Sequence, residues 1–230
     1  MAKSRRAVKE DAREIAGGEA ATANVRESIL DAAERQFAEN GIAGTTVRAI
    51  TAAAGVNVAA INYYFRSKDE LYREVVNRRL GPLNEERAGL LTDFLRHAGV
   101  KRPNVKEMLR ALVEPSLRLC FESPHFARLL GRLRYDMDDS LWPAYRSAQA
   151  ELTDGFREAF AAALPGLPAG ETQARLHYVL GAIQQVWSHC PRPAGETPEE
   201  LLDSFLTFYA AGMSAPAPRT ARATKKKTRR

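Results

Sequence analysis

The spacing of hydrophobic residues along this 230-residue chain repeats every three to four positions, which is the period of an α-helix. Such apolar faces recur from about residue 24 to residue 213. No stretch between turn signals shows the sustained two-residue alternation that a half-buried strand would require. We therefore expect an all-α protein of about nine helices.

Two short helices joined by a glycine turn are predicted between Thr45 and Phe65. Thr45 or Thr46 can cap the first helix, because a threonine hydroxyl accepts a hydrogen bond from an otherwise unpaired N–H group. Gly55 can take the left-handed conformation that ends this helix, and Asn57 can cap the second one. Helix, turn and helix at this spacing form a helix-turn-helix, whose second helix enters the major groove of DNA.

Helices are also predicted on both sides of this arrangement. Asn24-Val-Arg-Glu27 is a capping box that would begin a bracing helix, and Asn40-Gly41 would end it. Ser67-Lys68-Asp69-Glu70 is a capping box that would begin the next helix. Gly81-Pro82 should kink or break that helix, because proline lacks the backbone N–H.

The segment GTTVRAITAAAGVNVAAINYYFRSKDELY, preceded by RESILDAAERQFAENG, resembles the N-terminal DNA-binding domain of the TetR/AcrR family of bacterial transcriptional regulators. The resemblance covers about residues 24–80, with the helix-turn-helix motif at 46–65. Asn62 stands where most relatives carry Tyr, and Val58-Ala59 stand where many carry Lys-Gly. The recognition segment VNVAAINYYF resembles a subgroup, so we interpret these departures as a variant in the choice of DNA.

The resemblance implies binding to double-stranded DNA at a palindromic operator. Arg48 could donate twice to a guanine, although a solvated surface arginine is the alternative, and Asn62 suits a bidentate contact with adenine. Tyr63 can donate to a phosphate, whereas Tyr64 would face inward with Ile61 and divide between packing and a phosphate contact. The other predicted DNA-binding residues are two threonines and a lysine near the phosphates, and three small apolar residues suited to thymine methyl groups: Thr45, Thr46, Lys68, Val58, Ala59 and Ala60.

Residues 81–213 are predicted to form a helical effector-binding and dimerisation domain. Its aromatic residues could line a cavity with an arginine or histidine as a polar anchor, although ordinary core packing explains each of them equally well. The predicted pocket residues are Phe121, Arg134, Trp142, Tyr145, His177, Tyr178 and Trp187. By the resemblance, the last two helices, about 171–190 and 198–213, would form a homodimer interface. An unknown small-molecule effector would then move the helix shared by both domains and release a repressor from DNA.

The two ends of the chain differ from its body. The net charge is +6, but seven Lys and Arg residues between 216 and 230, where there is no acid, leave residues 1–215 at −1. Residues 214–230 are rich in Pro, Ala, Lys and Arg and are expected to be disordered, and residues 1–23 are expected to form a flexible arm. The basic tail keeps open an architectural DNA-binding protein with little sequence preference.

A small all-α enzyme is the less favoured alternative. No Ser, Asp or Glu stands in a known catalytic motif and the four histidines are scattered, so we expect no catalysis, no metal and no cofactor. The two cysteines, Cys120 and Cys190, are expected to be reduced and buried, as in a cytoplasmic protein. No apolar run approaches the ~20 residues that cross a bilayer, so we expect no membrane contact. The resemblance implies a bacterial cytoplasmic, nucleoid-associated protein.

Overall fold

The computed structural model describes residues 2–98, 103–136, 142–189 and 197–218, with side chains for residues 23–97, 103–133, 149–188 and 197–218. Over these ranges the chain forms nine α-helices and no strand, which confirms the predicted fold class. The helices are α1 (Ala2–Gly44), α2 (Val47–Ala54), α3 (Ala59–Phe65), α4 (Lys68–Ala98), α5 (Val105–Glu122), α6 (Pro124–Asp136), α7 (Trp142–Ala163), α8 (Ala169–His189) and α9 (Pro198–Ser214). Among these described helices, none is both long and apolar enough to cross a membrane.

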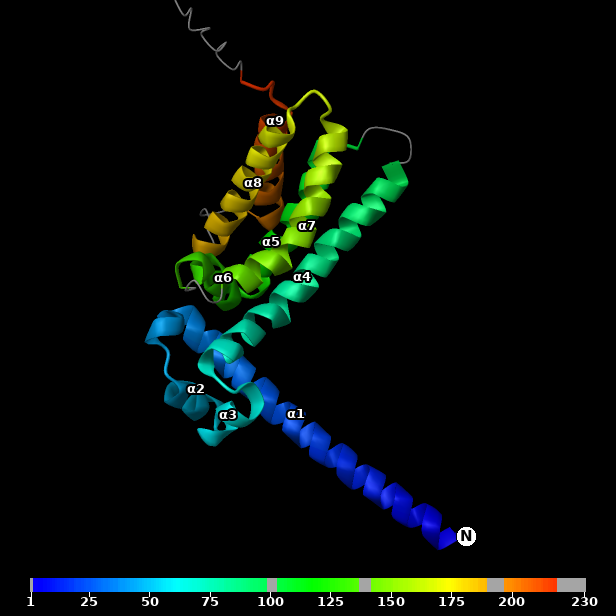
Figure 1. Cartoon of the computed structure of the whole chain (residues 1–230), viewed down its shortest axis with the longest axis vertical. Coiled ribbons are helices and arrows are strands. Elements are labelled where there is room, and N and C mark those ends of the chain that lie inside the picture. The colour runs from blue at the N-terminus through cyan, green and yellow to red at the C-terminus, as the bar shows by residue number, and fades with distance from the viewer. Residues whose placement is uncertain (1, 99–102, 137–141, 190–196, 219–230) are drawn as a thin grey trace, which may run out of the picture.

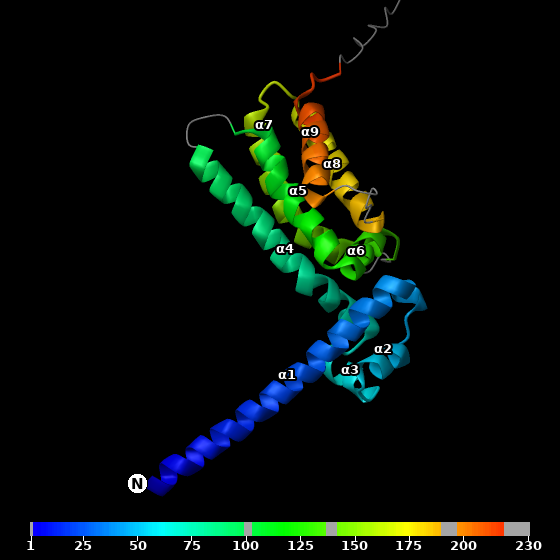
Figure 2. The same ribbon diagram turned by 180° about the vertical axis from the view of Figure 1, so that it is seen from behind.

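Two groups of helices share α4, as Figures 1 and 2 show from opposite sides. α1, α2 and α3 lie at one end of the molecule around the start of α4. α4 then runs along one edge of the second group, α8 and α9 lie side by side on the other edge, and α5 and α7 lie between them. The residues that follow α9 lie at the end of this bundle farthest from α3 (Figure 1).

The first helix is longer than the sequence predicts. α1 begins at Ala2, and Asn24 lies inside it, where its carbonyl oxygen accepts a hydrogen bond from Ser28 Oγ at 2.9 Å. The predicted helix start at Asn24 is therefore wrong, because the Ala-, Glu- and Arg-rich residues before it favour helix and carry it through the capping box. The predicted end agrees better, since Gly41 has φ 69° and ψ 172° and interrupts α1 directly after Asn40.

Three helices begin at side-chain caps, and the first of these confirms the predicted capping box at Ser67. Ser67 Oγ accepts a hydrogen bond from the backbone N–H three residues later, in the first turn of α4, at 3.1 Å. Asn104 Oδ1 accepts one from the N–H two residues later, in the first turn of α5, at 2.9 Å. Thr197 and Glu200 bond each other's backbone N–H groups at the start of α9, which is a complete capping box.

Two prolines lie inside helices without ending them. α4 continues through Pro82 and α5 through Pro115, although each proline lacks the N–H that would bond the carbonyl one turn earlier. Pro115 is buried, and Leu80 and Leu83 on either side of Pro82 are also buried, so tertiary packing holds both helices together. The break considered at Gly81-Pro82 does not occur, and α4 joins both groups of helices as one element.

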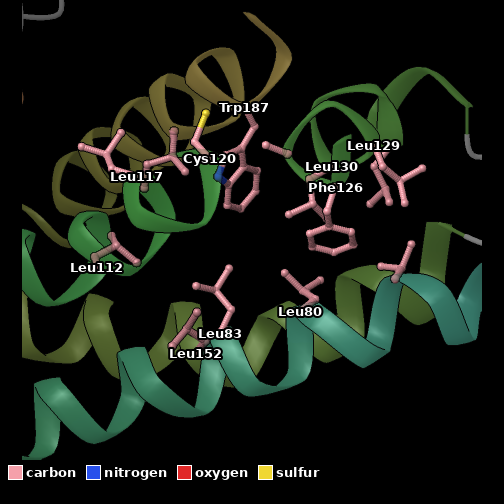
Figure 3. Close-up of a cluster of buried hydrophobic side chains, with 14 of the residues drawn as sticks. Leu80, Leu83, Leu112, Leu117, Cys120, Phe126, Leu129, Leu130, Leu152 and Trp187 are labelled. Atoms are coloured by element: carbon pink, nitrogen blue, oxygen red, sulfur yellow. The ribbon is translucent and has the colours of Figure 1, made fainter. Parts of the chain in front are cut away.

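One hydrophobic core extends from the first group of helices into the second. Figure 3 shows one cluster of this core, in which Leu80 of α4 points toward Phe126 of α6. Trp187 of α8 closes this cluster from the other side and is only 5% exposed. Side chains of α4, α6 and α8 therefore contribute to the same core, which links the two groups of helices.

Cys120 in this core differs from the expectation of a reduced thiol. Its side chain is 1% exposed, as predicted, but it is disulfide-bonded. The prediction of a free thiol is wrong, because cysteine spacing in the sequence cannot indicate pairing between segments that only the fold brings together. Cys190, the other cysteine of the chain, lies outside the described residues.

Candidate nucleic-acid interface

The turn between α2 and α3 is fixed by hydrogen bonds to the last carbonyls of α2. Gly55 has φ 68° and ψ 29°, and its N–H donates to the Ala52 carbonyl at 3.3 Å. The N–H of Val56 donates to the Thr51 carbonyl at 3.0 Å, which completes a Schellman motif. A side chain at Gly55 would be strained in this left-handed conformation, so glycine sets the angle between the two helices.

α3 is held by a polar cap and two buried anchors. Asn57 Oδ1 accepts a hydrogen bond from the Ala59 N–H at 2.9 Å, as the sequence predicts. Ile61 is 1% exposed and Phe65 is 2% exposed, whereas Tyr64 is half-buried. The inward residues are therefore Ile61 and Phe65, and Tyr64 keeps an accessible part, because Phe65 lies one helical turn after Ile61.

Exposed residues lie on α3, directly before it, and at the start of α2. Tyr63 is 76% exposed and Val58 is 44% exposed. We call the exposed residues of the predicted DNA-binding set the outer face: Thr46, Arg48, Val58, Ala59, Asn62 and Tyr63. Ala60 is half-buried and lies at the edge of this face.

The polar groups of the outer face remain available for a partner. Among the described residues, the Arg48 guanidinium and the Asn62 amide form no hydrogen bond or ion pair within the chain. The Tyr63 ring packs edge-on against Tyr64, with ring centroids 4.8 Å apart, and this contact holds an otherwise exposed phenol in place. Thr46 caps α2 by accepting from the Ala49 N–H at 3.1 Å, which leaves its hydroxyl proton free to donate.

Two predicted DNA-binding residues are instead engaged within the protein. Thr45 is 2% exposed, and its hydroxyl donates to the Gly41 carbonyl at 2.7 Å. Lys68 Nζ donates to the carbonyls of Ile42 at 2.8 Å and Thr45 at 3.1 Å. The Thr45 side chain is therefore not accessible to DNA and does not belong to the interface. Lys68 keeps one ammonium proton for a phosphate, because it has three donors.

Arg66 joins α3 to α4 in an unusual backbone conformation. It has φ 64° and ψ −41°, and the Ser67 N–H donates to the Phe65 carbonyl across it at 2.7 Å. This is a γ-turn of the rare, strained kind, and Arg66 is the only non-glycine residue with positive φ in the described chain. Arg66 is exposed and directly follows the last residue of α3.

A network of ion pairs braces α4 against α1 behind the interface. Arg78 of α4 lies 3.0 Å from Glu27, 2.8 Å from Asp31 and 2.8 Å from Glu34, all on α1. Burial alone would lower the pKa of Arg78, but the hydrogen bonds to these three carboxylates outweigh it and raise the pKa. The guanidinium is therefore permanently charged and holds the two helices at a fixed angle.

The predicted effector-pocket residues do not line one cavity in the described part of the chain. Trp187 is in the core, where its Nε1 donates to the Ser116 carbonyl at 3.0 Å. Phe121 lies in a groove against the start of α9, whereas Tyr178 is 68% exposed on α8 and His177 beside it is also exposed. The side chains of three predicted residues lie outside the described ones: Arg134, Trp142 and Tyr145.

Two arginines with structural roles were not predicted from the sequence. Arg132 of α6 donates to the Glu39 carbonyl at the end of α1, at 3.0 Å. Arg87 of α4 is 2% exposed, donates to the Leu112 carbonyl at 3.1 Å and lies over the Trp187 ring at 5.5 Å. In the sequence, a structural arginine on an amphipathic helix looks the same as a solvent-exposed one. The sequence therefore carries no signal that would identify these two residues.

Family profiles match both groups of helices. Residues 29–75 match the profile described as bacterial regulatory proteins of the tetR family. Residues 110–212 match the profile described as a tetracyclin repressor-like C-terminal domain. The first match contains the whole outer face, and the second contains α6 to α8 and most of α5 and α9.

Curated relatives align mainly through the helix-turn-helix region. The HTH-type transcriptional dual regulator CecR of Shigella flexneri is 51% identical over 47 residues, which cover 20% of this chain and 21% of the relative. The HTH-type transcriptional repressor BepR of Brucella suis is 31% identical over 100 residues, which cover 44% of each chain. The matched part is thus less than half the length of either relative.

Solved structures share the fold over most of the chain. A TetR-family transcriptional regulator from Bordetella parapertussis has a TM-score of 0.65 at 20% identity, over 81% of this chain and 94% of that one. AibR, solved with isovaleryl coenzyme A and operator DNA, has a TM-score of 0.64 at 19% identity, over 80% of this chain and 97% of that one. With both of its halves matched by family profiles, this chain belongs to the TetR family of bacterial regulatory proteins.

Proposed function

We propose that the protein is a homodimeric transcriptional repressor that binds a palindromic operator and is released by a small-molecule effector. The observation that carries this proposal is the outer face, where Arg48 and Asn62 are exposed and have no partner among the described residues, while Ile61 and Phe65 anchor α3. Small residues between the polar ones allow close approach to the bases. The structural relative AibR was solved with both an effector and operator DNA, which supports the same pair of partners here.

A dimer through α8 and α9 is part of the proposal. Phe208 of α9 is 72% exposed and Tyr178 of α8 is 68% exposed. Phe208 packs edge-on against Tyr209, with centroids 5.0 Å apart, and Tyr209 stacks on Phe205 at 4.3 Å. Preorganised exposed aromatic surface of this kind suits a protein interface. Two copies would present two α3 helices to successive half-sites of a palindrome.

The architectural alternative depends on the basic tail, most of which lies outside the described residues. α9 ends at the end of the bundle farthest from α3, so the tail starts on the side away from the outer face (Figure 1). This placement favours readout by the helix-turn-helix over binding by the tail alone. The proposed place of action is the bacterial cytoplasm, where operator DNA is found.

Selection from random DNA tests the proposal. Full-length protein should enrich a palindrome, and footprinting should protect two half-sites about one helical turn apart or a multiple of it. The Arg48→Ala variant should fail to enrich the same sequence while still binding DNA weakly. Enrichment of no sequence, with uniform protection along the DNA, would overturn the proposal in favour of an architectural protein.

A further inference from the structure

An open groove of about 430 Å³ lies between α4 and α7. Leu91 of α4 and Leu152 of α7 are each less than a tenth exposed and form its apolar floor. Glu85 and Thr92 of α4 and Glu151 of α7 supply its polar rim. The volume lies within the range of small-molecule sites, roughly 300–1,000 Å³.

The groove carries negative charge that no residue with a described side chain neutralises. Glu85 and Glu151 form no ion pair with any described residue, and they face the groove from opposite helices. Their near neighbours are paired: Glu86 binds Arg118 at 2.6 Å, and Asp154 binds Arg157 at 3.1 Å. Within the described part of the chain, Glu85 and Glu151 therefore both line this groove without an ion-pair partner.

The nearest buried cation is directed elsewhere. Arg87 lies on the same helix but does not line the groove. Its Nε donates to the Leu112 carbonyl of α5 at 3.1 Å and its guanidinium lies over the Trp187 ring, toward the core. One of its nitrogens also donates to Asn84 Oδ1 at 3.0 Å, which leaves the Asn84 amide group at the groove. The Arg87 guanidinium is therefore directed into the core and is not part of the groove lining.

We propose that the effector of this protein is a lipophilic organic cation that binds in the groove between α4 and α7. Its apolar body would cover Leu91 and Leu152, and its charge would lie between Glu85 and Glu151. Binding would wedge α4 from α7. The start of α4 would move with it, and there Lys68 holds the carbonyls that precede α2. The inference that the groove binds a cation depends only on the residues that line it. The inference that this cation is the effector rests on the proposed function.

Two ions of the same shape and opposite charge test the chemistry of the groove. Isothermal titration of full-length protein with tetraphenylphosphonium should show binding, whereas tetraphenylborate should bind much more weakly. The double variant Glu85→Gln, Glu151→Gln should bind the cation about tenfold more weakly, because two partly exposed charge pairs are lost. Equal affinity for both ions, an unchanged affinity in the double variant, or no binding of the cation would overturn the proposal.

A steric variant tests the location. Gly155 lines the groove on α7, and a Cβ added there would meet no atom within 4 Å. Gly155→Leu should therefore fold normally and fill the groove, abolishing cation binding. Gly89→Leu is the matched control, since Gly89 is also an exposed helical glycine with open space but does not line the groove. Cation binding that survives in Gly155→Leu, or that is lost equally in both variants, would overturn the location.

The same variants separate this inference from the proposed function. With the selected operator, tetraphenylphosphonium should release the wild-type protein and the Gly89→Leu variant but leave Gly155→Leu bound. A protein that binds the operator and is not released by the cation contradicts the effector inference alone. A protein that binds the cation in the groove but selects no operator contradicts the proposed function alone.

Discussion

Arg132 of α6 reaches out of the larger group of helices and donates from Nη1 to the carbonyl oxygen of Glu39, at the end of α1, at 3.0 Å. The residue before it, Gly131, lies against α8, where a Cβ would come within 2.4 Å of the Ser188 Cα. α6 is thus fixed on one side to the helix that precedes the helix-turn-helix and on the other side to a helix of the proposed dimer interface.

Replacing this arginine should loosen the end of α1. Arg132→Met keeps the apolar stem but removes the hydrogen bonds to α1, and we expect a loss of about 1 kcal/mol of stability. Hydrogen exchange measured by mass spectrometry should become faster in peptides that cover the junction of α1 and α2. Arg128→Met is the control, because Arg128 is exposed and its hydrogen bonds stay within α6. Equal exchange in the two variants would show that Arg132 does not brace α1.

Two glycine substitutions should change stability in opposite directions. Gly55→Ala places a side chain at φ 68° and should cost about 1–2 kcal/mol. Gly89→Ala lies inside α4 with open space around it and should stabilise the protein by up to ~1 kcal/mol. Urea denaturation at constant protein concentration measures both. A Gly55→Ala variant as stable as the wild type would contradict the role assigned to the glycine turn.

The helix-turn-helix could be predicted from the sequence because its determinants are local. Gly55 and Asn57 act within a few residues of their own positions, so their spacing is sufficient to identify the turn and the cap. The proposed effector site could not be predicted this way. In the sequence Trp187 could equally line a pocket, because the Ser116 carbonyl that accepts its hydrogen bond lies 71 positions away on α5. In the sequence Glu85 does not differ from other surface carboxylates, because only the fold brings α7 beside it.

The N-terminal cap of α9 should make the proposed dimer helix sensitive to acid. The backbone N–H and the hydroxyl of Thr197 hold the pKa of Glu200 below its ordinary value of 4.5. A carboxylate with a lowered pKa stabilises the fold above its unfolded pKa and loses that contribution as the pH falls through its folded pKa. Glu200→Gln keeps the capping geometry but removes this charge.

The wild type should therefore have a higher melting temperature than Glu200→Gln at neutral pH. The two melting temperatures should converge as the pH falls below 4.5, the ordinary pKa of a glutamate. Thermal denaturation across this pH range at one protein concentration measures the difference. A difference that stays constant with pH would show that the charge of Glu200 does not contribute.

An acidic residue at the exposed aromatic patch should prevent dimerisation. Phe208→Glu changes a side chain that is 72% exposed in the single chain, so the fold should survive while the proposed interface acquires two buried charges. Sedimentation velocity at micromolar concentration should show a monomer. Leu90→Glu is the control, because Leu90 is 41% exposed on α4 and lies away from α8 and α9. A dimeric Phe208→Glu variant would place the interface elsewhere.

The central claim is that the outer face reads a DNA sequence, and the affinity of Arg48→Ala for two DNA fragments tests it most directly. Fluorescence anisotropy with the selected operator should show a loss of about 1–3 kcal/mol, because a bidentate contact to a base is removed. With a random fragment of the same length and at the same salt concentration, the affinity should change much less, since phosphate contacts dominate there. An equal loss on both fragments would reduce Arg48 to a phosphate contact, and no loss on either would contradict the proposed interface.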